Sequence, residues 1–397
     1  MIARGWCFGA DGRPVRSIRL VLPALVVEGT VGLRRPDVKS LLPEAPGDNT
    51  GFEIRAPLPR GRFQVELQAQ DAEGRWSTLL RETASAPRWR RPIWLRGGDL
   101  AELVAFQLSA HAAHPPRPLR FESFPRRPES SGKRPRIGIV TPSFNQARYL
   151  EACMQSVLNQ PGVELNYAVQ DGGSTDGSRK IIELRAQELT AWESGPDDGQ
   201  VHALIRGFSR LSGGPDDLVA WLNSDDFYFP GALGFVAGWF ARHPDVDVIY
   251  GHRIVVNEDA QEIGRWFLPK HDDEVLRLND FIPQETLFWR RRIWEKAGGL
   301  DPSFQFAMDW DLLLRFQAAG ARIVRVPYFL ACFRSHPAQK TAALMNTIGM
   351  QEIERLRTRV QGRSIPAPQL ERDPRLIRYL RRSAWIEQLW RLGIRSP

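Results

Sequence analysis

At its centre the sequence reads Leu218-Val219-Ala220-Trp221-Leu222-Asn223-Ser224-Asp225-Asp226, an apolar run that ends in two adjacent carboxylates. A short apolar run bounded by polar turn residues predicts a buried strand of a parallel sheet. Open α/β sheets bind ligands at the carboxyl ends of their strands. Two neighbouring carboxylates repel each other and are best held together by a divalent cation. Taken alone, the pair is better explained as turn and capping residues before Pro230, and only its surroundings favour a cation site.

From Arg136 onward, predicted strands alternate with predicted helices, which is typical of βαβ units and a mostly parallel sheet. The expected strands are 137–141, 165–170, 191–194 and 218–223, and the expected helices between them end near residues 159, 188 and 211. The residues that follow these strands are Pro142, Ser143, Asp171, Asp197, Asp198, Asp225 and Asp226. Acidic groups at successive strand ends predict a site for a metal and a hydroxyl- or amide-rich ligand.

Composition places the chain among ordinary globular proteins, because 42% hydrophobic and 25% charged residues are normal proportions. Its 397 residues predict two or three domains. No apolar run approaches the roughly 18 to 20 residues that span a bilayer, and residues 1–6 lack the apolar core of a signal peptide. Cys7, Cys153 and Cys332 are isolated, which favours core positions in a reducing cytoplasm.

The net charge of +8 is concentrated outside the central domain. Residues 87–136 hold 11 Lys and Arg against 4 acids, and residues 371–397 hold 7 Arg against 3 acids. Arginines interleaved with Trp and Phe suit an anionic membrane surface, although solvated surface arginines are an equal alternative. No nucleic-acid motif accompanies the charge, so we expect no nucleic-acid partner. Dinucleotide-binding and P-loop glycine motifs do not occur.

Four segments are expected. Residues 1–86 predict an all-β sandwich with an accessory role, since Phe63, Val65, Leu67 and Ala69 alternate onto one face. Residues 87–135 predict a basic, Pro-rich linker with one helix at about 99–110. Residues 136–340 form the α/β domain, and residues 341–397 a helical basic extension. Apolar residues of that extension recur at three- and four-residue steps, which predicts a helix for a membrane interface, for the catalytic domain or for a second subunit of a homodimer.

Five motifs in this order resemble those of family 2 glycosyltransferases with a GT-A fold, over roughly residues 136–340. They are 141–145, 171–178, 223–226, 309–315 and 333–336. The resemblance is to the branch that makes polysaccharides and cell-surface glycans. It implies a nucleotide-diphospho-sugar transferase domain with a mostly parallel sheet flanked by helices.

The resemblance further implies a nucleotide-sugar donor, usually a UDP-sugar, bound with Mn or Mg. On this analogy Pro142 and Ser143 line the base pocket, and Asp171 accepts a hydrogen bond from the base. The positions that contact the ribose and the metal are Asn223, Asp225 and Asp226, with Asn223 in place of the usual first acid. Which of Asp225 and Asp226 ligates the metal stays open. Further donor-side positions are Asp197, Asp198 and His336, the last of which also matches a metal or diphosphate contact.

Asp309 matches the catalytic base of the family, although Met308 replaces the acid that often precedes it. Transfer to a hydroxyl requires such a carboxylate to remove a proton; a helix N-cap role is the alternative. On a helix, Asp311 and Arg315 lie four residues apart and are expected to pair. The expected acceptor-side residues are Gln284, Glu285 and Trp310.

The predicted function is therefore inverting, metal-dependent transfer of a sugar to a glycan or glycolipid acceptor. The expected location is the cytoplasm, with attachment to the inner face of the membrane left open. A nucleotidyltransferase, or an inactive glycan-binding or scaffold protein, is the alternative, because Asn223 and Met308 depart from the pattern.

Overall fold

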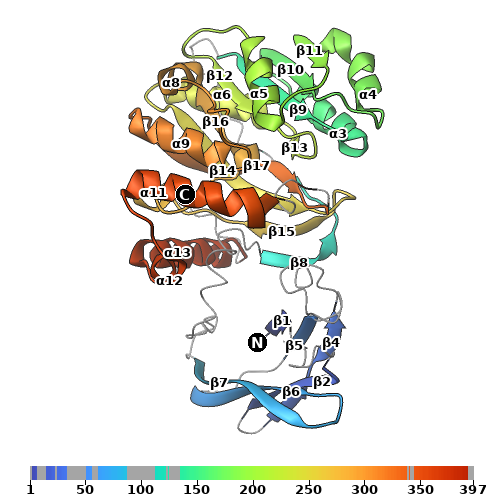
Figure 1. Ribbon diagram of the computed structural model, residues 1–397, viewed down its shortest axis with the longest axis vertical. Coiled ribbons are helices and arrows are strands. Elements are labelled where there is room, and N and C mark those ends of the chain that lie inside the picture. The colour runs from blue at the N-terminus through green and yellow to red at the C-terminus, as the bar shows by residue number, and fades with distance from the viewer. Residues whose placement is uncertain are drawn as a thin grey trace. The chain divides into compact units, whose positions relative to one another are not determined.

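The computed structural model consists of two compact units, Met1–Leu100 and Ala101–Pro397 (Figure 1). The structure describes residues 2–6, 15–22, 25–33, 51–55, 61–86, 112–121, 124, 135–337, 339 and 344–391. The helix expected at about 99–110 lies outside the described residues.

The described part of the first unit is built from antiparallel strands. Their bounds are β1 Ile2–Trp6, β2 Ser17–Leu22, β3 Leu25–Glu28, β4 Thr30–Leu33, β5 Gly51–Arg55, β6 Gly61–Gln70 and β7 Trp76–Ala86. One sheet has the order β1-β5-β4 and the other the order β3-β2-β6-β7. Alternation along β2 and β6 places Ile18, Leu20, Val65 and Ala69 in a small core together with Phe52.

The second unit contains one large sheet with the strand order β11-β10-β9-β12-β16-β14-β15-β8, and β17 also pairs with β13 and β14. The strands are β8 Ala112–Arg117, β9 Ile137–Ser143, β10 Leu165–Asp171, β11 Ala191–Ser194, β12 Leu218–Trp221, β13 Phe227–Tyr228, β14 Val248–Val256, β15 Glu262–Trp266, β16 Phe288–Arg290 and β17 Ile323–Arg334. Strands β11, β10, β9 and β12 are parallel, as predicted. Beyond β12 most pairings are antiparallel, so the sheet as a whole is mixed rather than mostly parallel.

Helices cover both faces of the parallel strands. Successive side chains of β9 point to opposite faces of the sheet, so each face presents side chains on which a helix packs. On one face, Cys153 of α3 (Ala147–Leu158) lies against Thr141. On the other face, Gly207 of α5 (Gln200–Ser209) lies against Val140 so closely that a Cβ at residue 207 would be 2.4 Å from a Val140 methyl. The predicted α/β class, with a central sheet flanked by helices, is confirmed.

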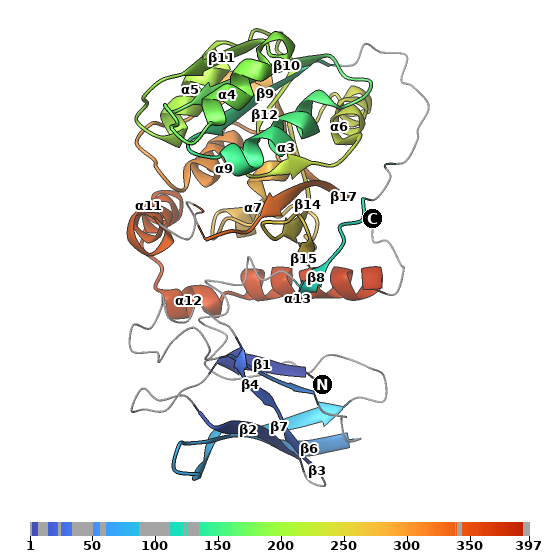
Figure 2. The same ribbon diagram turned by 90° about the vertical axis from the view of Figure 1, so that its right-hand side faces the viewer.

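The remaining helices of this unit surround the sheet (Figure 2). They are α4 Ser178–Leu184, α6 Ala232–Arg242, α7 Asp273–Leu276, α8 Arg291–Ala297, α9 Met308–Ala318, α11 Met350–Gln361, α12 Ala367–Glu371 and α13 Pro374–Arg391, with short helices at Ala186–Glu188, Gln284–Thr286 and Met345–Gly349. No helix in the described part of the chain has the length and apolar content needed to cross a membrane.

Part of the expected linker belongs to the sheet. Strand β8 pairs with β15 at its edge, where Pro115 and Pro116 are tolerated because an edge strand has one unpaired side. The buried Glu262 joins the two strands: it accepts hydrogen bonds from Arg265 at 2.7 Å and Arg117 at 2.5 Å, and lies 3.1 Å from His114. The ion pairs compensate for burying this carboxylate.

The C-terminal region is helical, as predicted, and packs on the second unit. Tyr379 of α13 packs against Phe281 with ring centroids 4.5 Å apart, and Trp390 packs against Phe267 at 5.1 Å. The apolar side of α13 is therefore used within this unit. Its opposite side presents exposed residues at three- and four-residue steps, namely Arg378, Arg381, Arg382 and Trp385.

Candidate active site

The carboxyl ends of three parallel strands bring sequence-predicted residues side by side. Asp171 at the end of β10 is in register with Ser143 of β9 and with Ser194 of β11. Ser143 is buried, and Pro142 precedes it in β9. The strand register thus gathers the predicted base-pocket residues at one edge of the sheet.

Asp171 is fully buried, and hydrogen bonds from its own loop hold it. Its carboxylate accepts from the backbone N–H groups of Gly173 and Ser174 and from the hydroxyls of Ser174 and Ser194, at 2.5 to 3.2 Å. These contacts balance the cost of burying a charge. Gly173 has φ of 83°, which lets the loop turn back over the carboxylate.

The loop after β11 lies beside this turn. Asp197 packs against Gly172, where an added Cβ would be 3.1 Å from its Oδ2, and its Oδ1 accepts from the backbone N–H of Gly199. Asp198 is exposed. The structure thus places Asp197 next to Asp171, whereas Asp198 faces solvent.

Asn223 has a structural reason to be an amide. Its Oδ1 accepts from Gln200 at 2.7 Å, and its Nδ2 donates to Gln284 Oε1 at 3.1 Å. Gln284 in turn donates to the carbonyl of Trp221 at 2.9 Å. The carboxylate of an ionised Asp only accepts hydrogen bonds, so it could accept from Gln200 but could not donate to Gln284. Asn223 therefore links α5 to the segment that carries Gln284.

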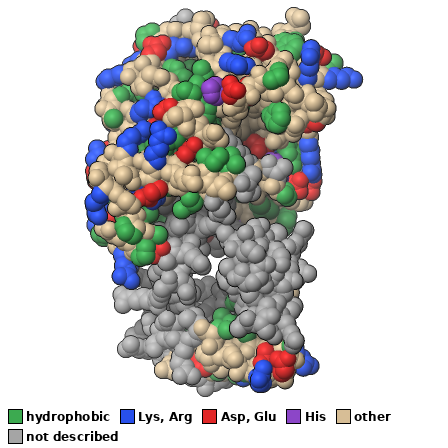
Figure 3. Space-filling model, viewed as in Figure 1, with side chains coloured by type: hydrophobic (Ala, Val, Ile, Leu, Met, Phe, Trp, Pro, Cys, Tyr) green, Lys and Arg blue, Asp and Glu red, His purple; other side chains and the backbone are tan. Residues whose placement is uncertain are grey.

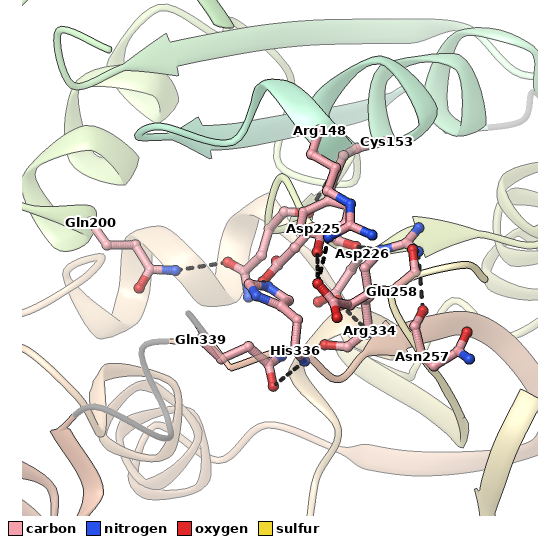
Figure 4. A network of polar contacts seen from close by, with 12 residues as sticks. Arg148, Cys153, Gln200, Asp225, Asp226, Asn257, Glu258, Arg334, His336 and Gln339 are labelled. Carbon is pink, nitrogen blue, oxygen red and sulfur yellow. Dashed lines mark hydrogen bonds and ion pairs between the residues drawn. The ribbon is translucent and has the colours of Figure 1, made fainter. Parts of the chain in front are cut away.

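Asp225 and His336 form a close pair from distant parts of the chain (Figure 4). Asp225 Oδ2 lies 3.0 Å from His336 Nε2, and the His336 ring packs against Tyr149 with centroids 4.9 Å apart. His336 is buried, and the Asp225 side chain is 16% exposed, so the pair is accessible from the Asp225 side.

Asp226 points into the protein instead. It is buried, and its Oδ1 accepts from the backbone N–H of Arg334 at 2.9 Å. Burial, and then repulsion from Asp225 and Glu285, raises the pKa of Asp226 well above its usual range. The two adjacent acids therefore have different environments, which the sequence did not distinguish.

Arg334 organises this loop rather than facing a ligand. Its guanidinium donates to the carbonyls of Asp225, Asn257 and Glu258 at 2.9 to 3.2 Å. It also lies over the Tyr149 ring at 4.8 Å from the centroid. These contacts fix the backbone that carries Asp225 (Figure 4).

The expected acceptor-side residues are buried. Glu285 forms a two-bond ion pair with Arg253, at 2.8 and 2.7 Å. Trp310 is 1% exposed, and its indole N–H donates to the carbonyl of Leu276. The burial of Trp310 contradicts its expected place on the acceptor side, because its ring is enclosed in the core.

Asp309 lies in the first turn of α9 and is half-buried, and its Oδ1 accepts from the backbone N–H of Trp310 at 2.9 Å. Asp311 pairs with Arg315 at 2.7 Å, as the four-residue spacing predicts. Sequence reasoning missed Asp280. Burial, followed by repulsion from Asp309, raises the pKa of Asp280 well above its usual range. No sequence motif relates these two distant carboxylates.

Arg253 connects the two groups of acids electrostatically. Burial disfavours its charge, but Glu285, Asp226 and Asp280 outweigh that effect and raise the pKa of Arg253. Asp280 thus interacts with Asp309 and with Arg253. Figure 3 shows acidic side chains in a hollow on one face of this unit.

The donor set suits a divalent cation that a ligand helps to hold. Among the described residues, no three His, Cys, Asp or Glu side chains cluster as a complete metal site. Asp225 Oδ2 and His336 Nε2 are 3.0 Å apart, which equals the spacing of about 3 Å between adjacent ligands of an octahedral ion with bonds of about 2.1 Å. Mg²⁺ is typically bound by one or two protein ligands together with substrate phosphates and water.

A known sequence family matches the central part of the chain. The profile of glycosyl transferase family 2 matches residues 138–297, from β9 to the end of α8. Residues 138–297 form a family 2 glycosyltransferase domain. The match includes the Asp171 turn, the Asp225 loop and Gln284, whereas Asp309 and His336 lie beyond it in the same compact unit.

Three proteins have sequences similar to part of this chain. A PGL/p-HBAD biosynthesis glycosyltransferase of Mycobacterium tuberculosis is 26% identical over 195 residues, which are 48% of this chain and 73% of that protein. The O-antigen biosynthesis protein RfbC of Myxococcus xanthus is 28% identical over 48% of this chain and 15% of its own length. Chondroitin synthase of Pasteurella multocida is 25% identical over 47% of this chain and 19% of its own length.

Solved structures resemble this chain more distantly. S. aureus TarS in complex with UDP-GlcNAc is 15% identical, with a TM-score of 0.47, over 62% of this chain and 72% of that one. The mannosyltransferase PcManGT of Pyrobaculum calidifontis, in complex with GDP-Man and Mn²⁺, is 17% identical, with a TM-score of 0.45, over 70% of this chain and 77% of that one.

Proposed function

We propose that this glycosyltransferase transfers a sugar from a nucleotide-sugar, most simply a UDP-sugar, to a hydroxyl of a glycan or glycolipid in cell-surface polysaccharide synthesis. The observation that carries the proposal is the Asp225–His336 pair after β12, in the same compact unit as Asp309. The names of the relatives, which concern PGL/p-HBAD, O-antigen and chondroitin synthesis, support the class of acceptor.

In this proposal Asp225 and His336 hold Mn²⁺ or Mg²⁺, and Asp226 stays behind them as a buried structural acid. The bound ion would neutralise the charge that develops on the departing nucleoside diphosphate. Pro142, Ser143 and Asp171 bind the base, and Asp197 packs beside them. Asn223 fixes the floor of this site through Gln200 and Gln284.

Asp309 is the proposed general base. It removes the proton from the acceptor hydroxyl while the hydroxyl oxygen attacks the anomeric carbon and the bond to the diphosphate breaks on the opposite side. A single displacement of this kind inverts the configuration at the anomeric carbon. Burial and repulsion from Asp309 raise the pKa of the nearby Asp280, so Asp280 stays protonated more readily than an ordinary Asp.

The test is a UDP-sugar panel with Mn²⁺, scored for UDP release and for transfer to a glycan or glycolipid acceptor. We expect Asp309→Asn to bind the donor like the wild type and to lower kcat by about 100-fold or more. Release of pyrophosphate from a nucleoside triphosphate would instead identify a nucleotidyltransferase. Absence of turnover with every donor, despite nucleotide binding, would favour an inactive glycan-binding protein.

We also propose that the exposed side of α13 binds the anionic inner face of the cell membrane, where lipid-linked acceptors are found. Arg378, Arg381, Arg382 and Trp385 lie three, four and seven residues apart and so share one face of the helix. Trp385 is 61% exposed, and arginines beside an exposed indole match the membrane–water interface.

A further inference from the structure

The helix that carries Asp309 needs support from outside itself. The residue at the N-cap position of α9 is Ala307, whose methyl group cannot accept a hydrogen bond. Backbone N–H groups at the start of a helix lack partners within the helix and need acceptors from elsewhere. The Asp309 carboxylate projects from this first turn, so its position depends on what holds the turn.

Glu352 of α11 supplies an acceptor at the N-cap position and two more for the segment that leads into the helix. Its carboxylate accepts from the backbone N–H groups of Gln305, Phe306 and Ala307, at 2.7, 2.8 and 2.8 Å. Glu352 is buried, so these charge-assisted hydrogen bonds are shielded from water. The negative charge of Glu352 also lies near the positive end of the α9 helix dipole, and this interaction is favourable.

A second contact lies two turns further along α11. Arg359 follows Glu352 by seven residues and therefore lies on the same face of the helix. Arg359 Nη2 is 2.7 Å from Oδ1 of the fully buried Asp311. The other carboxylate oxygen of Asp311, Oδ2, pairs with Arg315. Glu352 and Arg359 thus hold the start of α9 and the residue two positions after Asp309.

The same helix also holds the segment that leads to Asp280. Arg357 donates to the carbonyl of Leu278 at 2.9 Å, and Gln361 donates to the carbonyl of Arg277 at 3.0 Å. Asp280 and Asp309 repel each other. Contacts from one rigid helix to both segments keep the two carboxylates close despite this repulsion.

We propose that α11 is a positioning element for catalysis and that Glu352 is its principal positioning residue. This inference rests on the proposed role of Asp309. Glu352 does not reach the substrate; it sets the place of the Asp309 carboxylate through the backbone of residues 305–307. Misplacing a reacting group by about 1 Å can cost roughly 100-fold in rate.

The experiment compares Glu352→Ala and Glu352→Gln with the wild type, and uses Gln351→Ala as a control on the exposed side of the same helix. We calculate kcat from the concentration of protein that still binds nucleotide. We expect Glu352→Ala to lower this kcat by about 10- to 100-fold and to leave KM for the donor unchanged. Glu352→Gln keeps an acceptor oxygen for the N–H groups and should recover part of kcat. Gln351→Ala should match the wild type.

Two results would overturn the inference. The first is a kcat per folded, nucleotide-binding site within twofold of wild type in Glu352→Ala, because Glu352 would then only stabilise the fold. The second is an equal effect of Gln351→Ala. Asp309→Asn separates this inference from the proposed function: full activity of Asp309→Asn refutes the proposed base, whereas loss in Asp309→Asn with normal Glu352 variants refutes only the role of α11.

Discussion

At the scale of single residues, the site depends on which polar atoms can donate and which can accept. Asp225 and Asp226 are neighbours in sequence, yet one faces His336 and the other the backbone of β17. Arg334 contacts both residues differently, because its guanidinium donates to the Asp225 carbonyl and its backbone N–H donates to the Asp226 carboxylate. The metal-binding hypothesis therefore concerns Asp225 rather than the pair.

Asn223 provides a prediction at this scale. In Asn223→Asp the donor to Gln284 is lost, and two acceptors face each other in the interior. We expect the free energy of unfolding to fall by about 1–3 kcal/mol, measured by urea denaturation. Asn223→Ser, which keeps a hydroxyl donor, should lose less. If Asn223→Asp were as stable as the wild type, the amide chain would not be the reason for Asn at this position.

At the scale of elements, the part of the site that the sequence predicted is the part built from consecutive strands. The apolar runs of β9, β10 and β12 identified the strands, and the geometry of parallel strands then placed Ser143, Asp171 and the Asp225 loop at one edge. The local pattern of α9 also predicted the Asp311–Arg315 pair.

The remaining features depend on contacts between distant elements. Asp280 lies near Asp309, and Glu352 supports α9, only because α7, α9 and α11 pack together, and no local pattern reports such packing. Trp310 is an aromatic residue of the kind that can pack against a sugar, but it lies in the core. The sequence pattern did not predict strand β8, because prolines are typical of linkers as well as of edge strands.

The Glu262 cluster between β8 and β15 gives a prediction of pH dependence. Burial disfavours the ionised form, but hydrogen bonds from Arg265 and Arg117 outweigh it and lower the pKa of Glu262 to about 2. A carboxyl with a lowered pKa in the folded state stabilises the fold above its ordinary pKa and loses that contribution as the pH falls toward 2.

We expect Glu262→Gln to destabilise the protein by about 3 kcal/mol at pH 7, and the difference from the wild type to shrink as the pH falls from about 4.5 to 2. Urea denaturation over this pH range measures it. Glu164→Gln, at an exposed ion pair with Arg136, is the control and should change stability little. A deficit in Glu262→Gln that stayed constant with pH would contradict the ionised state of Glu262.

At the scale of the whole molecule, the basic face of α13 predicts where the enzyme works. The protein should sediment with vesicles that contain anionic lipid and less with zwitterionic vesicles, and salt should weaken the binding. Arg382→Glu should reduce the bound fraction severalfold, whereas Arg179→Glu, at an exposed arginine of α4, should not. Equal binding to both kinds of vesicle, or equal effects of the two variants, would exclude this face as the membrane contact.

We propose that Asp225 and His336, brought together from distant segments, form a cation site that holds a nucleoside diphosphate. The most direct measurement is the shift in Tm on adding UDP or GDP, with and without Mn²⁺, because ligands that bind the native state raise Tm. We predict a shift that requires Mn²⁺, is lost in Asp225→Asn and in His336→Gln, and persists in the exposed-acid control Asp259→Asn. A Mn²⁺-dependent shift of equal size in Asp225→Asn, or no shift in the wild type with either nucleotide, would contradict the claim.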